Sequence, residues 1–198
     1  MKKRISSIFC LLAFAITSMQ AKDYNVKDYG AIGNGKVLDH IAINATIDTC
    51  VAHGGGRVVL PAGTYLCGSI RMKSNVELHL MTGSKILAAP ASMKAYDEAE
   101  EFEGTAYQDG GHTYFKNSLI YAIGANDVSI TGRGMIDGEG LTRRDTEKGG
   151  NLHGGNIGTG DKAIAFKQCR NILIRDVTVY RGGHFGIIVT GCELGTID

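Results

Sequence analysis

Short apolar segments dominate this chain, and one stretch shows the spacing of a helix. Residues 39–53 place Ile43, Ile47 and Cys50 on one helical face. Asp39 stands where a helix is capped, and three consecutive glycines follow the stretch. The pattern predicts a helix over 39–53 whose start is capped by the Asp39 side chain.

Beyond this helix the apolar segments become shorter. Over residues 57–88 they are separated by Gly, Ser or Asn, which predicts short strands joined by tight turns. Two polar stretches interrupt the rhythm: 94–116, with six acidic residues, and the Gly-rich 140–162. We expect both to be excursion loops, and the charge of the first to face solvent.

The strand region also repeats itself. Residues 169–174 resemble 125–130 at an offset of 44, and 192–197 resemble 169–174 at an offset of 23, with 74–78 as a looser copy. These offsets indicate one coil per about 22 residues. A single coil cannot bury its apolar face, so the coils must stack as a parallel β-helix. The helix over 39–53 is expected to cover the first coil.

The first 21 residues are typical of a secretory signal peptide, with a basic start and an apolar run over 5–17. That run is shorter than the ~20 residues of a membrane span. The predicted organisation is a signal peptide over 1–21, an N-terminal segment with the capping helix over 22–56, and β-helix coils over 57–198. The protein is expected to be secreted or periplasmic, without membrane association after signal removal.

Composition narrows the functional classes. The chain has 198 residues, of which 43% are hydrophobic and 21% charged, as in a packed globular protein. A net charge of +1 gives no basic field for nucleic acid. Residues 30–36 spell Gly-x-x-x-x-Gly-Lys, but Val37 replaces the Ser or Thr of a phosphate-binding loop. No cofactor is expected, and no Cys or His spacing matches a metal site.

Four cysteines follow the signal peptide: Cys50, Cys67, Cys169 and Cys192. An even number in an exported protein permits disulfides, but buried thiols are the preferred interpretation. The repeat places Cys169 and Cys192 at equivalent positions of successive coils. Their sulfurs are therefore close enough to stack or to form a bridge.

Three segments resemble a known superfamily. Residues 26–80 look like the start of the pectate-lyase-like β-helix enzymes. Residues 118–140 resemble the polygalacturonase-type glycoside hydrolases of family 28, most specifically in Ile-Thr-Gly-x-Gly-x-Ile-Asp-Gly at 130–138. Residues 162–198 are similar to the stretch that precedes that family's catalytic motifs. The resemblance implies an all-β, right-handed parallel β-helix and inverting hydrolysis of galacturonosidic bonds in pectin.

Inverting hydrolysis needs two carboxyl groups about 6.5–9.5 Å apart. The family supplies them from an Asn-Thr-Asp motif and an Asp-Asp pair, followed by Gly-His-Gly and Arg-Ile-Lys. None of these motifs occurs in this sequence. We therefore expect no catalytic residue in the chain, which is expected to be the inactive N-terminal portion of a longer enzyme, ending in mid-coil, and a monomer.

The resemblance places a sugar-binding groove near a Gly-rich corner that here contains Arg181 and His184. Both residues could bind a uronate carboxylate of a pectic or other uronic-acid polysaccharide. A polar turn between strands is the alternative. Asp161 resembles part of a catalytic Asp-Asp pair, but Lys162 follows it, and a structural role is favoured. His112 and His153 are expected to be solvated loop residues.

Two other functions remain open at this point. A related β-helix lyase would cleave the same polymer by β-elimination, and a non-catalytic β-helix would only bind glycans.

Overall fold

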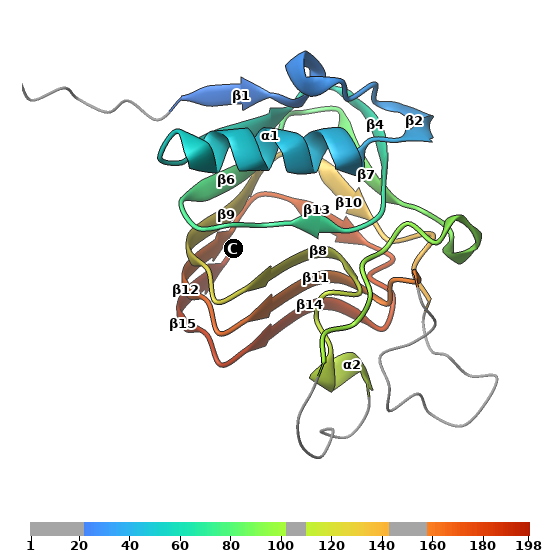
Figure 1. The fold of residues 1–198 in the computed structure, drawn as a ribbon, viewed down its shortest axis with the longest axis vertical. Coiled ribbons are helices and arrows are strands. Elements are labelled where there is room, and N and C mark those ends of the chain that lie inside the picture. The colour runs from blue at the N-terminus through green and yellow to red at the C-terminus, as the bar shows by residue number, and fades with distance from the viewer. Residues whose placement is uncertain (1–21, 102–109, 143–157) are drawn as a thin grey trace, which may run out of the picture.

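The chain winds into stacked coils with three sides, closed at one end by a helix (Figure 1). The computed structural model describes residues 22–101, 110–142 and 158–198. Each side of the coils is a parallel sheet, and neighbouring strands of a sheet come from successive coils. The predicted signal peptide lies outside the described residues, as do His153 and parts of both excursion loops. No helix in the described ranges is long and apolar enough to cross a membrane.

We name the three sheets A, B and C. Sheet A contains, in spatial order, β1 (Asp23–Asn25), β3 (Gly56–Leu60), β6 (Val76–Leu80), β9 (Asn126–Gly132), β12 (Arg170–Ile174) and β15 (Glu193–Ile197). Sheet B contains β13 (Thr178–Tyr180), β10 (Met135–Asp137), β7 (Ser84–Ala88), β4 (Gly63–Cys67) and β2 (Asn34–Leu38). Sheet C contains β14 (Phe185–Thr190), β11 (Lys162–Lys167), β8 (Ser118–Ile123) and β5 (Ile70–Arg71). The helices are α1 (His40–Ala52), α2 (Gly110–Thr113) and two short 3-10 turns, Val26–Tyr29 and Ala91–Met93.

The strand pairing confirms the predicted repeats. Ile172 pairs with Val128 on one side and with Gly195 on the other, which reproduces the offsets of 44 and 23. Val76 pairs with Val128, so residues 74–78 are the copy one coil earlier, as expected. The recurring aliphatic positions are therefore the positions that stack inside the coil.

Asn and Asp recur in the repeat because the chain turns there with a left-handed backbone. The φ angles are 62° at Asn75, 55° at Asp127 and 54° at Asn171, and Leu194 takes the same place in β15 with 55°. Short polar side chains tolerate this region better than other L-residues. In addition, Asn171 Nδ2 donates to Asp127 Oδ1 at 2.6 Å, which joins two coils at this corner.

Helix α1 covers the end of the stack, as expected, and buries Ile43, Ile47 and Cys50 completely. The prediction for Asp39 was wrong in one respect. Its side chain makes no cap hydrogen bond to the helix. Instead, the buried carboxylate accepts the backbone N–H groups of Ile32, at 2.6 Å, and Gly33, at 3.1 Å. The backbone N–H groups of the preceding loop thus take the place of those of the helix as donors to the carboxylate, and they fix the loop at the start of α1.

Asn171→Ala is expected to lower the free energy of unfolding by about 1 kcal/mol, because Ala at positive φ is strained. Asn171→Gly is the matched control: it also loses the contact with Asp127 but accepts the backbone angle. Urea unfolding of both variants measures the difference. Equal stability of the two variants would contradict the argument.

Candidate functional site

The two predicted sugar-binding residues lie in the turn between β13 and β14, where the chain passes from sheet B to sheet C. This turn packs directly on the preceding coil. His184 N–H donates to the Asp161 carbonyl at 2.7 Å. A Cβ on Gly183, whose φ is 76°, would lie 2.5 Å from that same oxygen. Glycine is required here because the two coils touch through their backbones.

Arg181 is fixed by two acidic side chains. Its guanidinium contacts both oxygens of buried Asp137, at 2.8 and 2.5 Å, and Glu139 at 3.1 Å. The hydrogen bonds to Asp137 raise the pKa of Arg181, and the one to Glu139 adds a smaller increase. The guanidinium also lies over the ring of Tyr180, 4.8 Å from its centre. Arg181 thus orders the turn in this conformation, and its contact with a uronate stays a prediction.

Asp137 belongs to the Ile-Asp-Gly run that carries the family resemblance. The structure shows its role: its carboxylate is 1% exposed and holds the turn of the next coil through Arg181. Sequence reasoning missed this contact. The offset of 44 was the available signal, because it relates Asp137 to Arg181 itself, although the backbones of β10 and β13 pair Asp137 with Tyr180.

Three rings meet at the start of β14. The ring of His184 lies edge-on to that of Phe185 at 4.4 Å, and His112 of α2 contacts Phe185 at 4.8 Å. The expectation that His112 is a solvated loop residue was therefore wrong. All three side chains are partly exposed, so they present apolar ring surface next to imidazole nitrogens. Such a combination suits a sugar, which offers both apolar faces and hydrogen-bonding groups.

An ion pair lies directly under these rings. Lys162 is completely buried at the start of β11 and donates to Asp161 Oδ1. Burial raises the pKa of Asp161, while the charges of Lys162 and His184 oppose the increase. The pair joins neighbouring residues at the start of β11, and the turn is bound to them through the Asp161 carbonyl, in agreement with the structural role favoured for Asp161.

Asp161→Asn is expected to lower the free energy of unfolding by about 3 kcal/mol, because it leaves a buried lysine without its counter-charge. The double variant Asp161→Asn with Lys162→Met should recover most of this loss, since a buried ion pair is commonly replaceable by apolar groups. Denaturant midpoints of the two variants provide the comparison. If the double variant is no more stable than the single one, the unpaired charge of Lys162 is not the cause of the lost stability.

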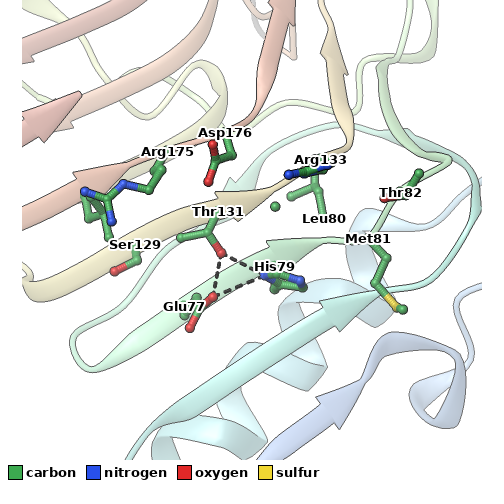
Figure 2. Close-up of a pocket in the computed structure, with 12 residues that line it drawn as sticks. Glu77, His79, Leu80, Met81, Thr82, Ser129, Thr131, Arg133, Arg175 and Asp176 are labelled. Atoms are coloured by element: carbon green, nitrogen blue, oxygen red, sulfur yellow. Dashed lines mark hydrogen bonds and ion pairs between the residues drawn. The ribbon is translucent and has the colours of Figure 1, made fainter. Parts of the chain in front are cut away.

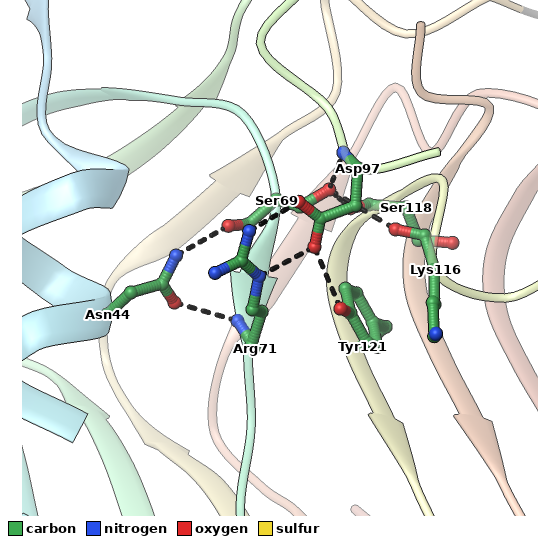
Figure 3. A network of polar contacts seen from close by, with 7 residues as sticks. All are labelled: Asn44, Ser69, Arg71, Asp97, Lys116, Ser118 and Tyr121. Carbon is green, nitrogen blue, oxygen red and sulfur yellow. Dashed lines mark hydrogen bonds and ion pairs between the residues drawn. The ribbon is translucent and has the colours of Figure 1, made fainter. Parts of the chain in front are cut away.

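Residues 94–101 lie against the outer face of sheet C. They are the first part of the acidic excursion loop. Asp97 lies at the centre of a polar network (Figure 3). Arg71 donates two hydrogen bonds to its carboxylate, at 2.7 and 2.6 Å, and Tyr121 donates a third at 2.8 Å. Asn44 joins this network to α1 by accepting Arg71 N–H and donating to the carbonyl of Ser69.

Glu100 fastens the same segment further along the face. Its carboxylate accepts the backbone N–H groups of Phe115 and Lys116, and lies 3.6 Å from Lys167 Nζ. The side chains of Asp97 and Glu100 are only 21% and 12% exposed. The expectation that this acidic charge faces solvent was therefore wrong for both residues.

The pH dependence of stability tests the Asp97 network. Burial raises the pKa of Asp97, but the hydrogen bonds from Arg71 and Tyr121 outweigh it and the pKa lies below the ordinary value. A carboxylate whose pKa is lowered in the folded state raises the free energy of unfolding above about pH 4. This contribution is lost as the pH falls further and the group is protonated. Asp97→Asn should therefore be less stable than the parent at neutral pH, by a margin that shrinks below about pH 4.

Urea midpoints from neutral pH to about pH 3 measure this margin. Asp48→Asn is the control, because Asp48 forms an exposed pair with Lys73 that contributes little. A margin that stays constant with pH would contradict the role of the Asp97 charge.

The four cysteines that the structure describes are all free thiols. Cys169 and Cys192 lie on neighbouring coils as predicted, with Cys169 N–H 3.2 Å from Cys192 Sγ. Among the described residues, no group of three His, Cys, Asp or Glu side chains is placed to hold a metal ion.

Comparison with known proteins gives a family and a fold. The profile of "Rhamnogalacturonase A/epimerase, pectate lyase-like" matches residues 24–193. The chain is 31% identical over 134 residues to an exo-poly-α-D-galacturonosidase of Dickeya chrysanthemi, covering 64% of this chain and 21% of that protein. It is 48% identical over 64 residues to mannuronan C5-epimerase AlgE2 of Azotobacter vinelandii, covering 28% of this chain and 6% of that enzyme.

The solved structure of a hyperthermoactive exopolygalacturonase from Thermotoga maritima superposes with a TM-score of 0.72 at 22% identity. It covers 90% of this chain and 46% of that enzyme. The expected all-β, right-handed parallel β-helix is confirmed. The chain spans about a fifth of the galacturonosidase that it resembles. Because the family profile matches most of its length, the chain belongs to the rhamnogalacturonase A/epimerase, pectate lyase-like family.

Proposed function

We propose that this chain is part of a polyuronate-active protein and that the whole protein hydrolyses galacturonosidic bonds of pectin with inversion. The similarity to an exo-poly-α-D-galacturonosidase is the observation that carries this proposal. The epimerase relative is named for mannuronan, a different polymer of uronic acid. The shared chemistry of the two polymers is a carboxylate on every sugar.

The corner formed by His112, His184 and Phe185 is the proposed contact with the polymer. The backbone of His184 is anchored to Asp161, and its ring packs edge-on against Phe185 at the start of β14. An imidazolium can bind a carboxylate by a charge-assisted hydrogen bond, and the ring of Phe185 offers an apolar face beside it. The corner can therefore contact both the carboxylate and the apolar face of a uronate residue.

Hydrolysis itself requires chemistry that this sequence does not contain. One carboxyl group must protonate the leaving oxygen while a second activates water. The two motifs that supply these groups in family 28 are absent from the chain, and Asp161 is engaged by buried Lys162. We infer that these coils bind and orient the polymer, and that carboxylates elsewhere in the whole protein perform the reaction.

A second candidate reaction begins with removal of the proton next to the sugar carboxylate. The similarity to a C5-epimerase favours it. Elimination after such a proton transfer gives an unsaturated product that absorbs in the near ultraviolet, whereas hydrolysis gives reducing ends without this absorbance. Neither product forms with a protein that only binds glycans, or with an epimerase, which inverts C5 without cleaving the chain.

Export also belongs to the proposal, because pectin is an extracellular polymer. N-terminal sequencing of the protein from the periplasm or medium should find a start near residue 22. A full-length N-terminus in the cytoplasmic fraction would contradict it.

The His184→Ala variant is expected to bind polygalacturonate about tenfold more weakly, because a charge-assisted hydrogen bond is lost. Affinity electrophoresis in gels with and without polygalacturonate measures this. His53→Ala is the matched control, since His53 is exposed at the end of α1 and bonds the carbonyl of Thr49. Equal retardation of the His184 variant and the parent would remove the corner from the proposal.

The reaction is tested with the chain 1–198 and with the product of the whole gene. The chain alone should release no reducing ends from polygalacturonate, and the whole product should release them without near-ultraviolet absorbance. Activity of the chain alone would contradict the assignment of catalysis to other residues. An inactive whole product would contradict the substrate, and an absorbing product would favour elimination.

A further inference from the structure

A groove crosses the outer face of sheet A (Figure 2). The His184 corner lies on a different side of the coils, between sheets B and C. The groove has a volume of about 610 Å³ and runs over β6, β9 and β12. Sites for small molecules commonly have volumes of about 300–1,000 Å³. Its size is therefore that of a ligand site.

The polar lining follows from the alternation of the strands. Val76, Leu78 and Leu80 of β6 point into the coil and are buried, so Glu77 and His79 between them point outward. Residues of the next coil stand directly beside these two. His79 pairs with Thr131 of β9, and Glu77 pairs with Ser129. Side chains distant in the sequence thus form one polar surface.

Three of these side chains hold one another in a single arrangement. Thr131 Oγ1 donates to Glu77 Oε1 at 2.5 Å, and His79 Nδ1 lies 2.8 Å from Thr131 Oγ1. A hydroxyl has one proton, and that of Thr131 is used by Glu77. His79 Nδ1 must therefore be the donor to Thr131. Nδ1 therefore carries a proton, and it also lies 3.2 Å from Glu77 Oε1. Nε2, on the opposite edge, is left to a ligand or to solvent.

Arginine side chains provide positive charge at the rim. Arg133 follows Gly132, whose φ is 107° and where a Cβ would lie 2.1 Å from the Leu80 carbonyl. The backbone N–H of Arg133 donates to that same carbonyl at 2.9 Å, so the turn is closely fixed. Within the described part of the chain, the guanidinium of Arg133 has no hydrogen bond or ion pair. Arg175 has one exposed contact, to Asp198 at 3.3 Å.

We propose that this groove binds an acidic sugar residue of a polyuronate, at a site separate from the His184 corner. The proposal rests on the proposed function for its substrate class. Arg133 and Arg175 bind the carboxylate of the sugar. Glu77 and Asp176 accept hydrogen bonds from its hydroxyl groups.

This combination selects against simpler ligands. A neutral sugar offers hydroxyl groups to the two acids but has no carboxylate for the arginines. An inorganic anion such as sulfate satisfies the arginines but donates no hydrogen bond to Glu77 or Asp176. A uronate residue satisfies both sets of groups. The hydrogen bonds among Glu77, His79 and Thr131 are formed before binding, so little entropy of side-chain ordering opposes the association.

The ring signals of His79 and His184 report on the two sites within one experiment. The probe is trigalacturonate, added to the chain while imidazole proton resonances are followed by NMR. The chain has six histidines, and the variant His79→Gln identifies the signal of His79. A neutral galactose trisaccharide is the control ligand. We expect a saturable shift of the His79 signal with trigalacturonate and none with the neutral trisaccharide.

Arg133→Gln should weaken the binding reported by His79 about tenfold and leave the titration of His184 unchanged. Arg170→Gln is the matched control, because it removes the same charge from sheet A at a residue whose only ion pair in the described chain, with Glu193, is exposed. It should leave both titrations unchanged.

The possible results separate the groove from the proposed function. If His184 responds and His79 does not, the groove site is wrong and the polyuronate proposal stands. If neither responds, both are wrong. An equal response of His79 to the neutral trisaccharide, or a loss with Arg170→Gln equal to that with Arg133→Gln, would overturn recognition of the carboxylate by Arg133.

Discussion

Backbone hydrogen bonds between successive coils hold the described strands of this molecule in place, because no coil has a closed core of its own. β12, for example, is bonded to β9 of the coil before it and to β15 of the coil after it. The apolar side chains inside therefore have to recur at the same place in each coil. The end of such a stack has to be covered, and α1 does this with Ile43 and Ile47.

This constraint explains which features could be predicted from the sequence. The helix expected over 39–53 is α1 at 40–52, and the predicted offsets of 44 and 23 are the observed strand registers. Both were accessible because buried positions repeat with the period of the structure. Charge pairs between equivalent places of the coils follow the same offsets, as Asp137 and Arg181 do at 44, but pairs made by the loops do not. Asp97 meets Arg71, 26 residues away, and Asp39 serves a loop instead of its helix, so local patterns predicted neither contact.

In the candidate sites too, features within one segment were predicted from the sequence, and contacts between coils were not. Arg181 and His184 could be proposed from the sequence because they lie in one Gly-rich turn. Asp137, which orders that turn, and His112, which packs on Phe185, belong to other coils. The groove on sheet A was missed entirely. Its central contact joins Glu77 to Thr131, 54 residues apart, and only the three-dimensional register brings them together.

The two surfaces are linked by the run at 130–138 that carries the family resemblance. Its second residue, Thr131, points outward into the groove on sheet A, while Asp137 holds Arg181 at the corner before sheet C. Between them, Gly132 and Gly134 allow the chain to pass close to Leu80 and Ser84 of the preceding coil. The spacing of this run is therefore set by one coil corner, which fixes the groove and the turn that carries His184 relative to the same backbone. A polymer bound at either surface would meet side chains placed by the stacked strands, with little conformational entropy left to lose.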